Sequence, residues 1–468
     1  MDTVYQALWT ALPFAVVLGL ALVSVAGVGV GLVSPRWLVY PYLAIFFLFN
    51  SAHYGNLQLA SGPGVYSRGS GMLYFALVSW AMLGAWCCAR AQAGFARLPT
   101  PECNLRPWFW GWLLLLALHA GVALALGRTL SEALAPTGFS NIVWMAPLVS
   151  LMLMAFRSRA AATGLARFIV CMGLARALYG LVRWAAFGGD PNNVYANMNA
   201  IQIKLTFFDI NDSLLCCIAF AIAAVQLFQA GGAARSRFWV ALDWAALGAT
   251  GLCIVLSYRR SAWIGLLLAM LVLMPRFAVR RRVALLLVGL PAVLAGFGYV
   301  ALKRFAQGRE AGLENVFYDM QSRRFGNESE RVLELKLALA DFLSNPLTGI
   351  GSWGRYAGYQ RISWQANPDG GQFLHSGVLH IALKSGVPGL LLLGGLAWAF
   401  IAFTRRALRC LPPELAGLGA AGAAGLAFML PDILIGTPIP QVRTTQMMAL
   451  CLALPYVALA ASRAPTPS

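Results

Sequence analysis

Residues 107–127 read PWFWGWLLLLALHAGVALALG, a run without Asp, Glu, Lys or Arg. A stretch of about 20 such residues is long enough to cross a bilayer as a helix. Similar apolar runs recur along the whole chain, and they lack the alternation of lipid-facing and lumen-facing residues that a membrane barrel requires. The sequence therefore predicts an all-α fold, a polytopic membrane helical bundle.

The composition excludes a soluble globular protein. Of the 468 residues, 59% are hydrophobic and 11% are charged, with a mean hydropathy of +0.69, which is more apolar surface than a soluble core can bury. The net charge of +18 is largely explained by the excess of Lys and Arg in cytoplasmic loops, so we expect no nucleic-acid partner. The nine cysteines lie in apolar runs or in predicted cytoplasmic loops, and a disulfide framework is not expected.

The apolar runs predict about twelve transmembrane helices, or thirteen if residues 1–50 cross twice. The runs lie near residues 8–33, 37–52, 71–89, 107–127, 139–156, 163–186, 213–230, 238–256, 261–275, 283–301, 376–404, 415–432 and 446–461. Five arginine clusters fall on alternate connections, so all five can face the cytoplasm together. They are Arg90/Arg97/Arg106, Arg157/Arg159/Arg167, Arg235/Arg237, Arg276/Arg280/Arg281/Arg282 and Arg405/Arg406/Arg409.

We expect three parts: an N-terminal transmembrane bundle (1–301), a long periplasmic loop subdomain (302–375) and C-terminal transmembrane helices (376–468). The loop carries nine Lys or Arg and eight Asp or Glu in a chain otherwise poor in acids. Within it, residues 327–330 resemble a capping box, and the apolar pattern that follows predicts an amphipathic helix ending at Asn345-Pro346. This helix either lies along the membrane surface or is a packed lid without chemistry.

Candidate functional residues gather at the predicted periplasmic end, because ionisable groups at a helix mouth usually serve function. Arg259 and Arg260 lie in Ser257-Tyr-Arg-Arg-Ser-Ala-Trp263, which joins two apolar runs almost without a loop. Guanidinium groups bind phosphate oxygens in pairs, although lipid headgroups are an alternative partner. Lys204 is the base of a second loop, where it either binds an anion or pairs with a nearby aspartate; in the same loop Asn211 is a candidate N-cap.

His375 is the third candidate. It lies where the long loop re-enters the membrane, and an imidazole can accept a proton near neutral pH, as a general base must. A structural histidine at a helix start is the alternative. His380 points to another face and is expected to be a core or lipid-interface residue. No metal-ligand spacing is visible, so we expect no metal and no other cofactor.

The order of these features resembles the bacterial O-antigen ligase and O-antigen polymerase superfamily over roughly residues 165–400. The 257–263 segment resembles that family's Ser-Arg-Gly-Ala-Trp turn, and residues 345–351, Asn-Pro-Leu-Thr-Gly-Ile-Gly, resemble its Asn-Pro-Leu-x-Gly-Ile-Gly stretch. His375 stands four residues before Leu379 and eleven before Gly386, as in the family's histidine motif. Arg260 matches the arginine of the turn, and Arg331 matches a further basic position.

The resemblance implies a bundle of the GT-C-like glycosyltransferase kind in the bacterial inner membrane, with its active site facing the periplasm. It implies inverting, metal-independent transfer of a glycan from undecaprenyl diphosphate to a sugar acceptor, which is a growing glycan in a polymerase or lipid A-core in a ligase. The expected roles are diphosphate binding by Arg260, Arg259, Lys204 and Arg331 and general base catalysis by His375.

Three departures from the ligase pattern favour a polymerase slightly. Ser376 replaces a common asparagine, Lys204 stands where an arginine is usual, and Lys384 occupies a position that is often acidic. Expected partners are membrane lipids and, for a polymerase, a chain-length regulator. The alternative function is a transporter or flippase of lipid-linked oligosaccharide. Such proteins usually show internal repeats and midplane charges, whereas here no repeat is evident and charges gather at one face.

Overall fold

The structure is a computed structural model that describes residues 26–49, 74–99, 101–191, 203–229, 235–289, 330–365 and 370–464, with positions 65, 66, 68, 193 and a few between 291 and 302. Regular structure in these residues is helical, and β pairing among them is limited to an isolated bridge between Gln229 and Phe277. The all-α prediction is confirmed, and the apolar helices make the chain a multi-pass membrane protein.

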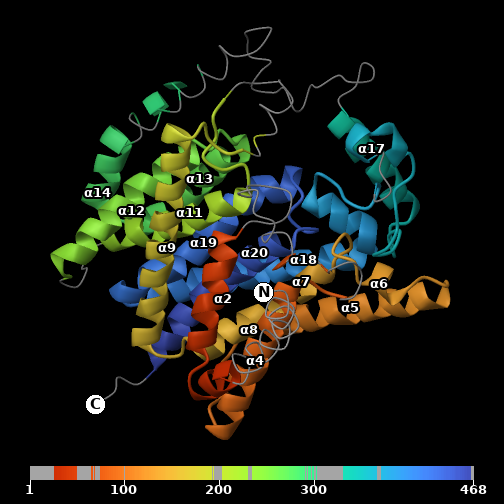
Figure 1. The fold of residues 1–468 in the computed structure, drawn as a ribbon, viewed down its shortest axis with the longest axis horizontal. Helices are drawn as coiled ribbons and strands as arrows, with labels where there is room; N and C mark the ends of the chain where they lie inside the picture. The colour runs from red at the N-terminus through yellow and green to blue at the C-terminus, as the bar shows by residue number, and fades with distance from the viewer. Residues whose placement is uncertain are drawn as a thin grey trace, which may run out of the picture.

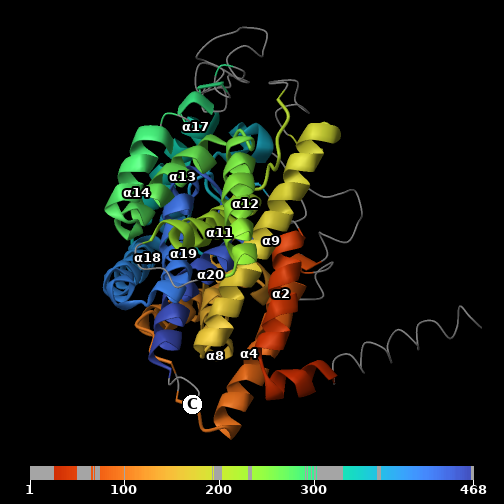
Figure 2. The ribbon, with the colours of Figure 1, turned by 90° about the vertical axis from the view of Figure 1, so that its left-hand side faces the viewer.

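Most helices follow the predicted spans (Figures 1 and 2). They are α2 (Arg36–Leu48), α4 (Leu77–Phe95), α5 (Arg106–Ala125), α6 (Leu130–Ala133), α7 (Ser140–Val143), α8 (Met145–Ala155), α9 (Arg159–Ala186), α11 (Ile210–Phe228), α12 (Arg237–Val255), α13 (Arg260–Leu273), α14 (Val279–Ala284), α17 (Glu330–Ser344), α18 (Gly377–Cys410), α19 (Pro413–Ile435) and α20 (Val442–Arg463).

The core is formed by α11, α19 and α20. Helices α11 and α20 are buried along most of their length, and α19 packs against both of them and against α13. Helix α19 is rich in Gly and Ala, which lets neighbouring helices approach closely where lipid supplies no hydrophobic drive. Helices α5, α12 and α18 lie at the periphery and leave most of their apolar surface outside the bundle.

Hydrogen bonds at the helix ends and in the loops that connect them show which ends of the helices lie together. Arg157 donates to the Pro99 carbonyl at 2.8 Å, Arg159 to the Ser462 carbonyl at 3.1 Å, and Arg276 to the Leu408 carbonyl. Gln229, just before the Arg235 cluster, donates to the Pro413 carbonyl at 2.7 Å. The five predicted arginine clusters therefore gather at one end of the bundle, called here the arginine end. The opposite end is called the His375 end.

The predicted number of about twelve spans is not confirmed. Seven helices among the described residues are long and apolar enough to cross a membrane. Helix α2 and the preceding helix Ala26–Val33 add an eighth if this pair, bent by 116°, is one span. The bend falls at Ser34-Pro35, since proline cannot donate a backbone hydrogen bond. Helices α8 and α13, with 11 and 14 residues, are too short to cross a bilayer alone.

The predicted amphipathic helix is confirmed as α17, which ends at Ser344 before Asn345. Most of its predicted capping box, residues 327–329, lies outside the described residues. Both views place α17 at the end of the molecule opposite the C-terminus (Figures 1 and 2). Its Ala338 packs with Tyr356, Leu374 and Leu383 in a small apolar cluster, so α17 is fixed to the start of α18 and to the loop before it.

Two sequence motifs meet where α18 is kinked. Gly386 has φ 65°, a left-handed conformation inside the helix that glycine adopts at little cost. The kink exposes backbone groups to the 345–351 stretch: Ile350 N–H donates to the Leu383 carbonyl and Val387 N–H to the Pro346 carbonyl, both at 2.8 Å. The kink thus anchors the loop that precedes His375.

Candidate active site at the His375 end

His375 is held by a buried carboxylate on α17. Its Nδ1 lies 3.0 Å from Glu334 Oε2, and its backbone N–H donates to the same oxygen at 3.2 Å. The Glu334 side chain is fully buried, whereas that of His375 is 22% exposed. The rings of Trp364 and Phe373 meet the imidazole edge to face at centroid distances of 5.4 and 5.9 Å. This geometry fixes the ring and assigns the proton of the neutral imidazole to Nδ1, leaving Nε2 as acceptor.

Glu334 is kept ionised although it is buried. Burial alone would raise its pKa, but hydrogen bonds from the His375 ring, the Gln365 amide and the His375 backbone, with the charge of His375, outweigh this and hold the pKa below its usual range. Gln365 Nε2 donates to Oε1 at 3.0 Å. Glu334 is not evident from the sequence, where this segment shows only one apolar helix face.

A second carboxylate, Asp432 near the end of α19, contacts one of the candidate cations and lies near two others. Arg259 Nη2 is 3.5 Å from Asp432 Oδ1, and His375 and Arg331 both lie within electrostatic range of the same carboxylate. The structure therefore brings three of the predicted site residues, from α13, α17 and the start of α18, around one acid. Asp432 was also missed, since it stands at the end of an apolar run without a neighbouring motif.

The arginine turn has a strained backbone. Tyr258 adopts φ 53°, which bulky side chains seldom do outside functional sites. The turn is held on both sides: Ser257 Oγ donates to the Ile254 carbonyl at 2.7 Å, and Trp263 Nε1 donates to the Val255 carbonyl at 2.9 Å. Arg259 also donates to the Phe208 carbonyl and stacks on the Phe208 ring. Arg260, half-exposed, begins α13.

Lys204 is exposed on a segment that runs beside this turn. Its neighbours Ile203 and Leu205 pack with Leu256 and Tyr258, and Thr206 N–H donates to the Leu256 carbonyl at 3.1 Å. Among the described residues of this loop, Lys204 forms no ion pair with an aspartate, and the aspartates pair with arginines instead. Asp190 pairs with Arg183, Asp209 with Arg443, and Asp212 with Arg176 and Arg443.

The Arg443 network is the most buried charged cluster that the sequence analysis missed. Arg443, at the start of α20, binds Asp209 at 2.8 Å and Asp212 at 2.9 Å, and it also donates to the carbonyls of Phe46 and Phe47 at the end of α2. Its place in a connection predicted to be periplasmic, where arginine is disfavoured, was the available signal. Asp209, rather than Asn211, caps α11.

Two further polar side chains of this region are buried within the bundle. His380 is fully buried and its Nε2 contacts the Gly138 carbonyl at 2.9 Å, as expected of a core histidine. Lys384 is buried too and donates to the Gly354 carbonyl. Among the described residues, no three His, Cys, Asp or Glu side chains come close enough together to hold a metal ion.

The arginine turn and His375 lie within one segment of the chain that matches a known family. Residues 245–394 match the family model described as O-antigen ligase. The resemblance to the O-antigen ligase and polymerase superfamily is confirmed. Among curated proteins, none matches the chain. The family implies glycosyl transfer by a membrane protein acting on a lipid-linked glycan and an acceptor.

The O-antigen ligase match covers part of the site. It includes Arg259, Arg260, Arg331, Glu334 and His375, and about a third of the chain in all. Lys204, Asp432 and Arg443 lie outside the matched residues, although Asp432 contacts Arg259 directly. The family-matched segment is therefore completed by side chains from α19 and from the loop before α11.

Proposed function

We propose that this protein is an inner-membrane, metal-independent, inverting glycosyltransferase that moves a glycan from undecaprenyl diphosphate to a sugar hydroxyl on the periplasmic side. The observation that carries the proposal is the His375–Glu334 pair, which lies at the same end of the bundle as the Arg259–Asp432 pair. A base fixed next to cations is what this transfer needs, because the acceptor must lose a proton while charge develops on the leaving diphosphate.

The donor half of the reaction is assigned to the cations. Arg260, Arg259, Arg331 and Lys204 bind the diphosphate, and their charges stabilise the negative charge that grows on the oxygen linking it to the sugar. Arginine suits this role because its planar fork can bind two phosphate oxygens at once. Asp432 would hold Arg259 in place and limit the repulsion among the cations before the donor arrives.

The acceptor half is assigned to His375. Its Nε2 takes the proton of the acceptor hydroxyl as the oxygen attacks the anomeric carbon from the face opposite the diphosphate. The bond from that carbon to the diphosphate oxygen breaks, and its electron pair leaves with the diphosphate. The imidazolium that forms is stabilised by the ionised Glu334, which touches no substrate and therefore acts as a positioning residue.

The same transfer can serve a polymerase or a ligase. The residues Ser376, Lys204 and Lys384, which depart from the ligase sequence pattern, favour an O-antigen or exopolysaccharide polymerase. The acceptor is then another lipid-linked glycan rather than lipid A-core, and a chain-length regulator is the expected partner. A transporter of the same lipid-linked donor would share the cations, but it would have no use for a general base.

The test uses purified protein, a lipid-linked donor and its acceptor. His375→Ala should lower the transfer rate by about 10²–10⁴-fold, the usual contribution of a general base, while donor binding changes little. Product should still form in excess EDTA. Full transferase activity in His375→Ala would remove this residue from the mechanism. Movement of donor between leaflets without a new glycosidic bond would favour the transporter.

A further inference from the structure

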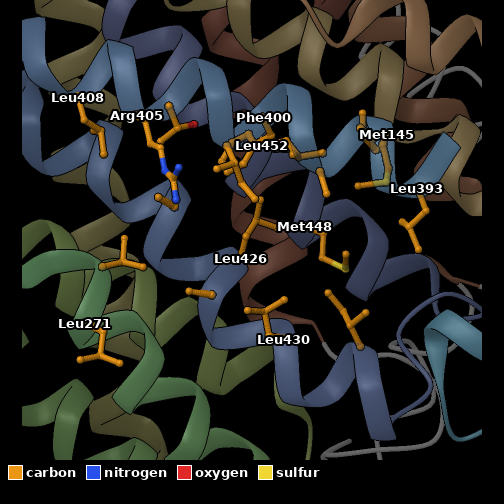
Figure 3. A pocket seen from close by; sticks show the side chains of 18 of the residues that line it. Met145, Leu271, Leu393, Phe400, Arg405, Leu408, Leu426, Leu430, Met448 and Leu452 are labelled. Carbon is orange, nitrogen blue, oxygen red and sulfur yellow. The ribbon is translucent and has the colours of Figure 1, made fainter. Parts of the chain in front are cut away.

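A large cavity lies between α13, α18, α19 and α20, and its lining extends from arginines of the arginine end to Ile433, the residue after Asp432. Its volume is about 800 Å³, within the usual range of ligand cavities, about 300–1,000 Å³. Its walls are almost entirely apolar along the membrane-spanning parts of these helices (Figure 3). The apolar lining includes Leu271 of α13, Leu393, Leu396 and Phe400 of α18, Leu426 and Leu430 of α19, and Met448 and Leu452 of α20.

The arginine end of this cavity is strongly basic. Arg276, Arg405 and Arg409 line it, and the lining residues include no Asp or Glu. Arg276 and Arg409 are close enough for their charges to act on each other. Figure 3 shows the Arg405 side chain pointing from α18 into the cavity rather than away from it. Three cations facing an apolar space without an acid favour an anionic ligand that also has an apolar part.

A buried hydroxyl at the same end lacks a partner. Thr404 is 4% exposed and lines the cavity, and its Oγ1 makes no hydrogen bond to any described residue. A threonine in a helix commonly bonds to the carbonyl one turn earlier, and a buried hydroxyl without a partner is unfavourable. A bound phosphate or ester oxygen would accept this hydrogen bond.

We propose that the cavity binds an anionic diacyl phospholipid, with its phosphate at Arg276, Arg405, Arg409 and Thr404 and its acyl chains along the apolar walls. Basic pockets between transmembrane helices on the cytoplasmic side commonly bind such headgroups, and the arginine end is the end that the charge pattern assigns to the cytoplasm. A polyprenyl chain alone would leave the three guanidinium groups without a counter-charge. The proposal is independent of the chemistry at His375.

The test is a competition between two lipids that differ only in headgroup charge. Purified full-length protein in a neutral detergent is mixed with equal amounts of dioleoyl phosphatidylglycerol and dioleoyl phosphatidylcholine, and retained lipid is measured by native mass spectrometry. The anionic lipid should be retained preferentially. Each arginine near a lipid surface contributes about 1 kcal/mol, so Arg405→Gln should weaken retention about fivefold, and Thr404→Val should weaken it as well.

Arg406→Gln is the matched control, because Arg406 is the next residue on α18 and is exposed, but it does not line the cavity. Equal losses in Arg405→Gln and Arg406→Gln would mean that the lipid binds through general surface charge, and would overturn the proposal. Thermal unfolding of each variant checks that it is folded.

Two further arms identify the occupant. Ala427→Phe places a ring in the cavity without altering its charge, since Ala427 lines the wall on α19, and it should weaken retention of the dioleoyl lipid. Inorganic phosphate at millimolar concentration should not displace the lipid. Displacement by phosphate would indicate a site for a free anion. Preferential retention of undecaprenyl phosphate that is insensitive to Arg405→Gln would assign the cavity to the polyprenyl chain; either result would overturn the proposal.

Discussion

His375 and Glu334 interact through two contacts that have different effects. The contact between Nδ1 and Oε2 fixes the tautomer, and the backbone contact to the same oxygen fixes the position of the residue in the chain. Because a histidine side chain can rotate about two bonds, either contact alone would leave the direction of Nε2 open. Together they fix both the ring and the backbone of a residue whose side chain is 22% exposed.

Glu334→Gln tests this pair. The glutamine keeps the shape of the side chain but loses the charge that stabilises the imidazolium, so the transfer rate should fall by about 10²-fold or more with a smaller change in KM. The free energy of unfolding should fall by about 1–3 kcal/mol. Kinetics over a range of donor concentrations and chemical unfolding at several pH values measure both effects.

The contribution of Glu334 to the stability of the fold should depend on pH with a definite sign. The pKa of Glu334 is lowered in the folded protein, so the carboxylate stabilises the fold above its ordinary pKa, and this contribution is lost as the pH falls through the lowered value. The stability difference between parent and Glu334→Gln should therefore shrink in acid. Glu330→Gln is the control, since Glu330 is a buried acid one turn earlier that bonds to Ser363 at 2.6 Å. An equal rate loss in both variants would contradict the role of Glu334.

The two arginines of the turn should respond differently to substitution. Arg260→Lys should lose most of the transfer activity while the melting temperature stays within about a degree of the parent, since an ammonium cannot bind two phosphate oxygens in one plane. Arg259→Ala should lose activity and stability together, because Arg259 also binds Asp432 and the Phe208 carbonyl. Parent-like activity in Arg260→Lys would exclude Arg260 from diphosphate binding.

For single residues, the sequence indicates which ones belong to the motifs, but it does not indicate which side chains they contact. His375 and Arg259 stand out because polar groups at the mouth of an apolar run are costly. Glu334 and Asp432 do not stand out, since each becomes significant only through a contact with a residue 41 or 173 positions away. Such contacts depend on how α17 and α19 pack, which no local pattern encodes.

Among the elements, α18 does most to place the site, because its kink fixes the loop that leads to His375. A Cβ at Gly386 would lie 2.5 Å from the Leu347 carbonyl oxygen, and the φ of 65° is unfavourable for any other residue. We expect Gly386→Ala to lower the free energy of unfolding by about 1–3 kcal/mol and to reduce transfer by displacing the loop.

Gly394→Ala is the control on the same helix, because a Cβ there meets nothing within 4 Å. It should leave stability unchanged or raise it by about 0.5–1 kcal/mol, the difference in helix propensity. Thermal unfolding in detergent compares the two variants. Equal stability would show that the kink is not needed to hold the 345–351 stretch.

Element positions were largely predictable, whereas their breaks were not. Apolar length locates α5, α9, α11 and α20 within a few residues, because a bilayer imposes that length on any spanning helix. The bend before α2 and the kink inside α18 depend on Pro35 and Gly386, and each residue is tolerated in many straight helices. Whether a proline or glycine bends a helix is decided by the groups that accept the freed backbone bonds.

For the whole molecule, the clearest test concerns its orientation in the membrane. The five arginine clusters lie at one end of the bundle and His375 lies at the other. Gln360→Cys, exposed near the His375 end, should react with an impermeant maleimide in intact spheroplasts of a cysteine-free strain. Val279→Cys, 69% exposed at the arginine end, should react only after permeabilisation. Labelling of residue 279 but not 360 would invert the orientation and exclude a periplasmic active site.

The Arg443 network also has a consequence for biosynthesis. The ribosome delivers α2, with its carbonyls at Phe46 and Phe47, at least 396 residues before Arg443. Until α20 enters the membrane, Asp209 lacks the cation with which it pairs, and an uncompensated acid in lipid is costly. A chain that stops before α20 therefore stays incompletely assembled at α2 as well as at its C-terminal side, in a form that proteolytic quality control can distinguish from the finished protein.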